Sequence, residues 1–375
     1  MINTSDLKNC CGCMACVSAC PVDAIRPSVD KNGFSVPFVD TEKCIFCGAC
    51  DKICAFDREK QTVQNVLGAY AFQLADKEAL KNSTSGGAFT ALSDAVLSSG
   101  GVVCGAVMDG FTVKHVFAED KEGRDAMRLS KYVQSDTTDV FEEVKRLLSG
   151  GRQVMFTGTP CQTAELTVYL GRQYDNLLLC DFLCHGVPNQ SLFSAHIAYL
   201  EEKYKKKAAG YSFRGKRYGW NHGIEEIVFS DGSYKDSRAV QSYSRFFQSG
   251  VSLRESCRNC KYRSRHRFSD ITIADFWGIE KVMGRQDAEG YSLLFVNTAQ
   301  GRCFAETLSA AGSLDELPLD KVLYRISEKP ASSKSDPEVF WKTFREQQYG
   351  GVVERYAKSS LLDSLKHEIK KKKSK

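Results

Sequence analysis

The sequence predicts an α+β protein of several domains, with a small cysteine-rich N-terminal module, a following α/β region with a mixed sheet, and C-terminal helices. Three observations lead to this fold class. The chain has 375 residues, which exceeds one ordinary hydrophobic core. One cysteine motif occurs twice near the N-terminus, where metal–thiolate bonds would supply much of the stability of a small module. Patterns of strand, loop and helix alternate in the middle of the chain, as in layered α/β folds.

The composition predicts a globular protein without a membrane span. Hydrophobic residues make up 42% of the chain and charged residues 26%. No run of about 18 apolar residues is present, and the N-terminus lacks the segments of a secretory signal, so we expect a cytoplasmic protein. The formal charge is only +5, and much of it lies in the tail at 366–375. We interpret this tail as a solvated helix end and expect no nucleic-acid binding; contact with a partner or an anionic surface is the alternative.

The N-terminal cysteines have the spacing of iron–sulfur ligands. The motif Cys-x2-Cys-x2-Cys-x3-Cys occurs twice, and in two-cluster ferredoxins the fourth cysteine of each motif ligates the other cluster. One 4Fe–4S cluster is therefore assigned to Cys10, Cys13, Cys16 and Cys54. The second is assigned to Cys44, Cys47, Cys50 and Cys20. Zinc also binds Cys-x2-Cys pairs, but two quartets of identical spacing favour iron–sulfur. Cys11 lies outside the spacing and is interpreted as a bystander.

Secondary-structure signals follow in order along the chain. Asn32-Gly33 between alternating apolar residues predicts a hairpin inside the module. After a polar link near 58–64, helices are expected at 88–98 and 138–148, and buried strands at 102–107, 154–156 and 177–179. This alternation predicts a mainly parallel sheet. Asp231-Gly232 predicts a second hairpin, further strands are expected at 271–273 and 293–296, and the chain is expected to be helical beyond about 330.

A second group of cysteines lies far downstream: Cys161, Cys184, Cys257 and Cys260. Two of them follow the ends of predicted strands, where α/β sheets place their ligands. Four thiolates would satisfy a third cluster, and structural zinc or unligated thiols remain open from spacing alone. Ser85-Gly86-Gly87 before a helix suits a phosphate group or a plain turn. Neither GxGxxG nor a Walker motif is present, and His185 is interpreted as a loop residue, with a proton-transfer role as the alternative.

Several short sequence segments, which follow one another in a fixed order, add to these observations and cover roughly residues 1–320. They are residues 83–90, 130–135, 158–162, 184–188, 213–216, 257–260 and 270–278. In series they resemble the beta subunits of coenzyme F420 hydrogenases and dehydrogenases, in the form with an N-terminal dicluster ferredoxin domain. The Cys-His-Gly-Val-Pro segment at 184–188 is similar to the bacterial branch, whose members often lack the deazaflavin coenzyme.

The resemblance implies bound FAD and a third 4Fe–4S cluster. It places Cys161, Cys184, Cys257 and Cys260 as ligands of that cluster. It also places these residues near the flavin: Ser85, Gly86, Gly87, Thr90, Lys131, Gln134, Thr157, Gly158 and Thr159. The implied domains are a dicluster ferredoxin domain at 1–62, an FAD-binding half at 63–148, a C-terminal half at 149–325 and a helical extension at 326–375.

These parts together predict an iron–sulfur flavoprotein oxidoreductase. A flavin accepts two electrons at once and a cluster accepts one, so a flavin beside three clusters converts between the two. We expect a redox partner protein such as ferredoxin and an unidentified small-molecule substrate. The alternatives are a non-enzymatic electron-transfer adapter without flavin, and a structural zinc domain in the C-terminal half.

Overall fold

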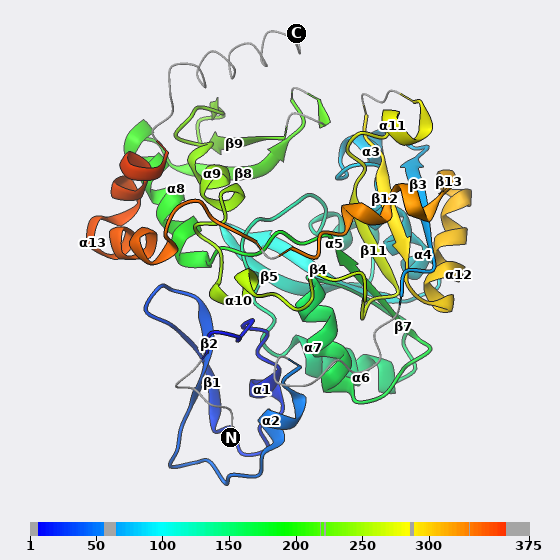
Figure 1. Ribbon diagram of the computed structural model, residues 1–375, viewed down its shortest axis with the longest axis horizontal. Coiled ribbons are helices and arrows are strands. Elements are labelled where there is room, and N and C mark those ends of the chain that lie inside the picture. The colour runs from blue at the N-terminus through cyan, green and yellow to red at the C-terminus, as the bar shows by residue number, and fades with distance from the viewer. Residues whose placement is uncertain are drawn as a thin grey trace.

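A computed structural model describes residues 7–55, 65–217, 219–220, 223–285, 289–329 and 331–357. Its centre is a mixed sheet (Figure 1), which has eight strands within the described residues, in the order β13-β3-β12-β11-β7-β6-β4-β5. In that order the strands are Gly312–Leu317, Gly68–Leu74, Ser292–Val296, Ile271–Asp275, Leu177–Phe182, Val154–Thr157, Val102–Asp109 and Thr112–Ala118.

The sheet is parallel only in its middle. The four central strands β4, β6, β7 and β11 run parallel. The outer strands are antiparallel: β5 pairs with β4 on one side, and β12, β3 and β13 follow on the other. The mixed sheet is thus confirmed, while the expectation of a mainly parallel sheet was wrong for its edges. A two-residue turn at 110–111 joins β4 to β5, and so short a connection allows only antiparallel pairing.

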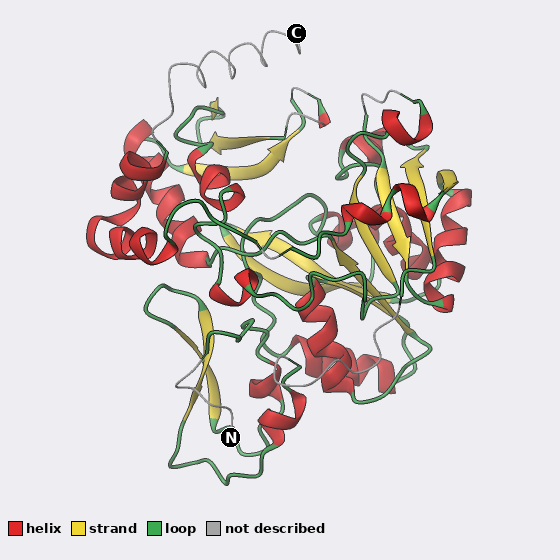
Figure 2. Cartoon of the chain, in the orientation of Figure 1, coloured by secondary structure: helices red, strands yellow, loops and turns green. Residues whose placement is uncertain are grey.

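Helices cover both faces of this sheet (Figure 2). Neighbouring residues of a strand point to opposite faces. On β4, Val103 accordingly packs with the helices α4 (Ala88–Ser98) and α12 (Ala299–Thr307). Cys104 packs with α6 (Val140–Ser149) and α7 (Pro160–Leu170) on the other face. Because both faces of the central strands are buried, their sequences are continuous runs of apolar residues.

Side-chain caps fix the start of several helices. Thr159 and Gln162 form a capping box at the start of α7, with Pro160 in its first turn. Asn189 caps α8 (Gln190–Tyr204) by accepting from the amide of Leu192. The helix expected at 138–148 begins two residues later, because Asp139 adopts a left-handed conformation that no helix continues.

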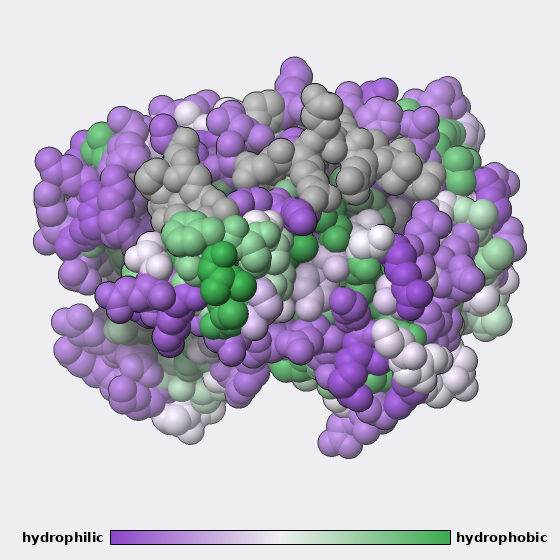
Figure 3. All heavy atoms as spheres, turned by 90° about the horizontal axis from the view of Figure 1, so that it is seen from below, coloured by the Kyte–Doolittle hydropathy of each residue, from purple (hydrophilic) through white to green (hydrophobic). Residues whose placement is uncertain are grey.

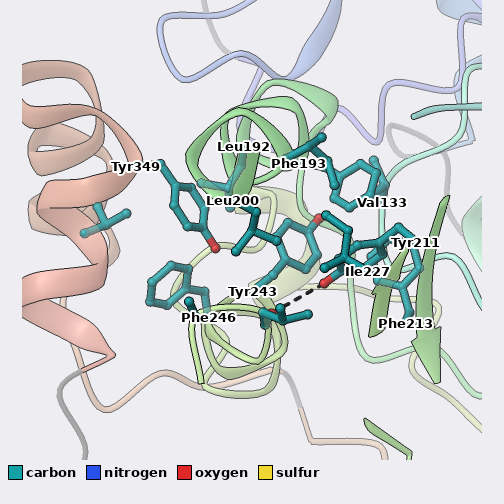
Figure 4. Close-up of a cluster of buried hydrophobic side chains, with 14 of the residues drawn as sticks. Val133, Leu192, Phe193, Leu200, Tyr211, Phe213, Ile227, Tyr243, Phe246 and Tyr349 are labelled. Carbon is teal, nitrogen blue, oxygen red and sulfur yellow. Dashed lines mark hydrogen bonds between the residues drawn. The ribbon is translucent and has the colours of Figure 1, made fainter. Parts of the chain in front are cut away.

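A second lobe carries an aromatic core (Figure 4). Its sheet consists of β8 (Ala208–Gly215), β9 (Ile224–Phe229) and β10 (Tyr234–Lys235), which contains the predicted hairpin at Asp231-Gly232. The helices α8, α9 (Ser242–Gln248) and α13 (Pro337–Tyr356) pack against it. Helix α13 confirms part of the helical C-terminus, while the predicted helix and basic tail at 358–375 lie outside the described residues.

Two ionisable side chains are enclosed in this aromatic core. Glu225 is fully buried, and burial raises the pKa of its carboxyl group to about 8. His196 is also fully buried, and burial lowers the pKa of its imidazole to about 3. The Nε2 atom of His196 lies 3.1 Å from the hydroxyl of Tyr211. Both groups are therefore neutral at pH 7.

The N-terminal module is a hairpin beside two short helices. Strands β1 (Ile25–Val29) and β2 (Ser35–Val39) pair in antiparallel fashion around the predicted Asn32-Gly33 turn, which confirms that hairpin. The helices α1 (Ala15–Ser18) and α2 (Ala49–Ile53) lie beside each other and contact α7 of the main domain. The predicted polar link at 58–64 lies outside the described residues.

Short elements complete the fold. The remaining helices are α3 (Lys77–Lys81), α5 (Lys121–Asp125), α10 (Glu255–Arg258) and α11 (Glu280–Met283), with 3-10 turns at Leu308–Ala310, Leu319–Lys321 and Leu323–Arg325. Within the described residues, no helix combines the length and the apolar character needed to cross a membrane.

Gly86 allows the chain before α4 to lie close against the backbone of β3 and β12, and its replacement by alanine is expected to destabilise the fold. A Cβ atom there would overlap the carbonyl oxygen of Phe72 and the amide nitrogen of Ser292, so two paired strands would have to move apart. We expect a loss of about 3 kcal/mol in the free energy of unfolding, measured by urea denaturation. Gly210→Ala is the control, because the corresponding position on β8 is open. Equal denaturation midpoints for the two variants would contradict the prediction.

Candidate iron–sulfur centres and cofactor cavity

The structure brings together the cysteines assigned to the first N-terminal cluster. Cys16 lies at the start of α1, and burial raises the pKa of its thiol. The neighbouring thiols of Cys10 and Cys54 raise that pKa further by charge repulsion. Cys13 and Cys16 interact in the same way. The thiols of Cys10, Cys13 and Cys54 therefore neighbour that of Cys16, although Cys54 is 38 residues away in the sequence. Cys50 of the second set is also a neighbour.

The second N-terminal set lines one small hollow at the surface. Its lining includes all four of the assigned cysteines, Cys20, Cys44, Cys47 and Cys50. The exposed side chains of Ile45 and Phe46 lie at the same hollow. In the view from below, a patch of hydrophobic residues is visible among hydrophilic ones (Figure 3). Both N-terminal sites offer sulfur donors in quartets, which suits an iron–sulfur cluster.

The four downstream cysteines converge from three parts of the fold. Cys161 lies in the first turn of α7, just after β6, and Cys184 follows β7. Cys257 belongs to α10, and Cys260 comes directly after that helix. Burial raises the pKa of the Cys184 thiol, and the other three thiols raise it further by charge repulsion. Charge repulsion also acts between each pair of the other three thiols, Cys161, Cys257 and Cys260. The donor set is thus four neighbouring thiols, which suits a 4Fe–4S cluster. Among the described residues, no three of these sulfurs lie within 4.8 Å of one another, as the ligands of one zinc ion would.

Cys11 joins the first N-terminal set to this downstream group. The motif spacing assigned it no role, yet its side chain is buried and its sulfur interacts with the sulfurs of Cys13 and Cys161. Its Sγ atom lies 3.9 Å from Oε1 of Glu165, a buried residue on α7. Sequence spacing contained no signal for this contact, because the two residues are 154 positions apart.

A cavity of about 440 Å³ opens at the carboxyl ends of the parallel strands, where α/β sheets bind their ligands. This volume suits a small-molecule or cofactor site. Cys161 and Cys184 contribute to its wall. Eight of the nine residues predicted near the flavin line it, namely Ser85, Gly87, Thr90, Lys131, Gln134, Thr157, Gly158 and Thr159. Gly86 does not line the cavity and instead packs against β3 and β12.

Polar atoms at the cavity wall lack hydrogen-bond partners within the described part of the chain. They are Nδ1 of His115, Oγ1 of Thr157 and Nε2 of His185. Burial lowers the pKa of His115 to about 4, so its ring is neutral at pH 7. Its Nε2 lies 2.9 Å from the carbonyl oxygen of Thr157 and must donate, which leaves Nδ1 as an acceptor. These unsatisfied groups fit a polar heteroaromatic ligand such as a flavin.

Lys131 and Gln134, two of the residues predicted near the flavin, form hydrogen bonds with other protein groups. The Nζ atom of Lys131 donates to the carbonyl oxygens of Met127 and Arg128, at 2.8 and 2.6 Å. Burial lowers the pKa of Lys131 to about 7. Gln134 donates to the carbonyl oxygen of Cys11 at 2.9 Å and accepts from Arg254 at the same distance. Both therefore shape the cavity wall, and Gln134 also connects it to the N-terminal module.

The cavity has further lining residues that the sequence did not assign to a role. Arg214 forms an ion pair of 2.7 Å with Asp275, which also accepts from the hydroxyl of Ser85. Trp277 is partly exposed and stacks on Trp220, with ring centroids 4.5 Å apart. Arg214 and Trp277 belong to segments of the family resemblance, whereas His115 lies on a strand that was not predicted.

The N-terminal sequence defines the class of protein. Residues 9–57 match the model of the 4Fe-4S dicluster domain. The protein is therefore an iron–sulfur electron-transfer protein whose N-terminal domain supports two clusters.

A later part of the chain matches a second family model. Residues 151–322 match the model for the C terminus of the beta subunit in coenzyme F420 hydrogenase/dehydrogenase. Residues 151–322 are thus similar to the C-terminal region of that family and follow a dicluster match, in the order that the resemblance implied. Among solved structures, a chain of the F420-reducing [NiFe] hydrogenase complex from Methanosarcina barkeri is 16% identical, with a TM-score of 0.42. That alignment covers 80% of this chain and 94% of the other. None of the curated proteins matches this chain.

Proposed function

We propose that the protein is a cytoplasmic iron–sulfur flavoprotein oxidoreductase that passes electrons between its N-terminal clusters and FAD in the central cavity. A third 4Fe–4S cluster on Cys161, Cys184, Cys257 and Cys260 would link the two. One observation carries this proposal: two cysteines of the converged downstream group, Cys161 and Cys184, also form part of the cavity wall. A cluster held there would lie directly beside a ligand in the cavity.

The cavity residues have distinct roles in this proposal. A bound flavin would supply two-electron chemistry and release electrons singly. The first turn of α4, where Phe89 and Thr90 line the cavity, would favour a phosphate group, while Ser292 already accepts from the amide of Ala88. The neutral His115 offers Nδ1 as an acceptor to a ligand N–H or O–H. The Arg214–Asp275 ion pair and the ring of Trp277 would orient an organic substrate beside the flavin.

Metal and flavin analysis of anaerobically purified protein tests the proposal. We expect about twelve irons and one flavin per chain. Cys184→Ala is expected to lose about four irons while keeping the eight of the N-terminal module. Cys303→Ala is the control, because that exposed cysteine belongs to none of the three sets.

Other outcomes would select the alternatives. About eight irons and no flavin would favour a non-enzymatic electron-transfer adapter. Zinc in place of the last four irons would favour a structural zinc domain. Reduced ferredoxin should also bleach the flavin absorbance of the wild-type protein. Clusters that become reduced while the flavin stays oxidised would contradict electron flow from the N-terminal module to the cavity.

A further inference from the structure

The side chain of Cys11 lies between two sets of ligands. Its sulfur, the sulfur of Cys13 and a carboxylate oxygen of Glu165 all lie within 4.8 Å of one another. On its other side, the same sulfur interacts with the sulfur of Cys161. Cys13 belongs to the first N-terminal set and Cys161 to the downstream set. A single buried sulfur atom is therefore in contact with a ligand of each.

Helix α7 holds this contact in place. Cys161 and Glu165 are four residues apart on that helix, so their side chains share one face. Oε1 of Glu165 accepts from the thiol of Cys11 at 3.9 Å, and Oε2 accepts from the amide of Ala55 at 3.0 Å. Ala55 directly follows Cys54, a ligand assigned to the same cluster as Cys13. One buried carboxylate thus fixes Cys11 and the end of the N-terminal module against the helix that carries Cys161.

The backbone of Cys11 is held as firmly as its side chain. Its carbonyl oxygen accepts from Nε2 of Gln134 at 2.9 Å, and the next carbonyl, that of Gly12, accepts from the same nitrogen at 3.3 Å. Gln134 and Cys11 both line the cavity. The position of the Cys11 sulfur is therefore determined from two sides and does not depend on the iron-ligand spacing of the motif.

We propose that Cys11 is the electron-transfer contact between the first N-terminal cluster and the third cluster, positioned by Glu165. This inference rests on the proposed function, because it requires a cluster on the downstream cysteines. One electron leaves one cluster and enters the other, so one is oxidised and the other reduced, and no bond or proton is exchanged. The rate of electron tunnelling falls less steeply with distance through atoms in contact than across an empty gap. Sulfur is the most polarisable atom that a side chain offers to fill the gap between the two clusters. A thiol hydrogen bond to a ligand sulfur would also tune the cluster potential.

The test is electron transfer in the full-length, cluster-loaded protein. Reduced ferredoxin is mixed with the protein, and freeze-quenched samples are followed by electron paramagnetic resonance for the delay between reduction of the N-terminal clusters and of the third cluster. We expect Cys11→Ala to lengthen this delay severalfold without loss of iron. Cys11→Ser keeps a hydrogen-bonding group of similar size and is expected to restore part of the rate. Cys104→Ala is the matched control, since it truncates a fully buried cysteine outside all cluster sets.

The outcomes separate this inference from the proposed function. A wild-type delay in a fully loaded Cys11→Ala protein would overturn it. If Cys11→Ala lost iron, the fully loaded Cys11→Ser protein would be measured in its place. An electron-transfer delay and a cluster potential equal to those of the wild type in that protein would overturn the role of Cys11. Wild-type protein with about twelve irons but no flavin would refute the flavin proposal alone, because this measurement follows only the clusters. Wild-type protein with about eight irons would overturn both.

Discussion

Replacing Arg254 with leucine is expected to loosen the N-terminal module from the rest of the protein while both parts keep their iron. The guanidinium is almost fully buried and donates to three acceptors. Nη1 donates to the carbonyl oxygen of Cys10 at 3.0 Å and Nη2 to that of Ser35 at 2.6 Å. Nε donates to Gln134 at 2.9 Å. Hydrogen bonds to a charged group contribute about 1.5–3 kcal/mol each, so we expect docking to weaken by about 4 kcal/mol after partial replacement by water.

Backbone geometry makes this contact specific to arginine. Gly12 has a φ of +69°, and a Cβ atom there would lie 2.5 Å from Nη2 of Arg254 and 2.7 Å from the carbonyl oxygen of Ser35. The module therefore approaches closely enough for a planar, forked donor group. Lysine keeps the charge but cannot reach three acceptors in fixed directions, so Arg254→Lys should show an intermediate effect.

Hydrogen–deuterium exchange measures the loosening directly. We expect faster exchange in α1 and β2 of the Arg254→Leu protein, with unchanged exchange in the central strands β6 and β7. Arg152→Leu serves as the control, because that partly exposed arginine pairs with Glu119 at the surface, at 3.1 Å. Exchange in α1 that matched the wild type would show that Arg254 does not hold the module.

Glu225→Gln is expected to remove a fall in stability that occurs as the pH rises from about 4.5 to about 8. Burial raises the pKa of Glu225 to about 8 in the folded protein, against an ordinary value of 4.5. The folded state therefore retains a proton that the unfolded state has lost, and its stability falls as the pH rises from about 4.5 to about 8. A difference of this size corresponds to as much as about 5 kcal/mol above pH 8. Glutamine, which carries no charge at any pH, should abolish the fall.

His196 in the same aromatic core acts in the opposite direction. Burial lowers its pKa from 6.5 to about 3, so its contribution to stability is gained as the pH rises through this range. The two slopes should largely cancel between about pH 4.5 and 6.5. Above about pH 7 the fall is opposed by Lys131, whose lowered pKa makes stability rise with pH. The Glu225 contribution is therefore measured as the difference between wild type and Glu225→Gln in urea denaturation at about pH 6.5 and 8. Glu338→Gln at the exposed start of α13 is the control. Equal pH slopes for wild type and Glu225→Gln would contradict the prediction.

The sequence predicted those parts of the fold and site that depend on neighbouring residues. The Asn32-Gly33 hairpin and the buried strands β6 and β7 depend on local turn chemistry and apolar runs. The dicluster domain followed from spacing, because cubane ligands on a short loop leave little freedom in the chain. Strand β5 was missed although its residues alternate between more and less buried positions, which is a strand signal.

The contacts that connect the parts could not be predicted. Arg254 reaches Cys10 across 244 residues, and Cys11 reaches Glu165 across 154. No periodicity or motif encodes a pair at such separation, since its geometry arises only when the sheet has formed. His115 enters the cavity for the same reason, because its strand pairs along β4 and turns one face towards the carboxyl ends of β6 and β7. The cavity itself is thus a product of tertiary structure.

The position of β3 has a consequence for how the protein is made. This early strand lies between β12 and β13, and Gln73 beside them donates to the carbonyl oxygen of Gly290 across 217 residues. A ribosome adds roughly 5–20 residues per second, so β3 waits roughly 12 to 50 seconds for β12 and β13, the strands that pair with it. The N-terminal cysteines emerge earlier still, well before Cys257 and Cys260 exist. Synthesis of the N-terminal cysteines and closure of the main sheet are therefore separated in time during translation.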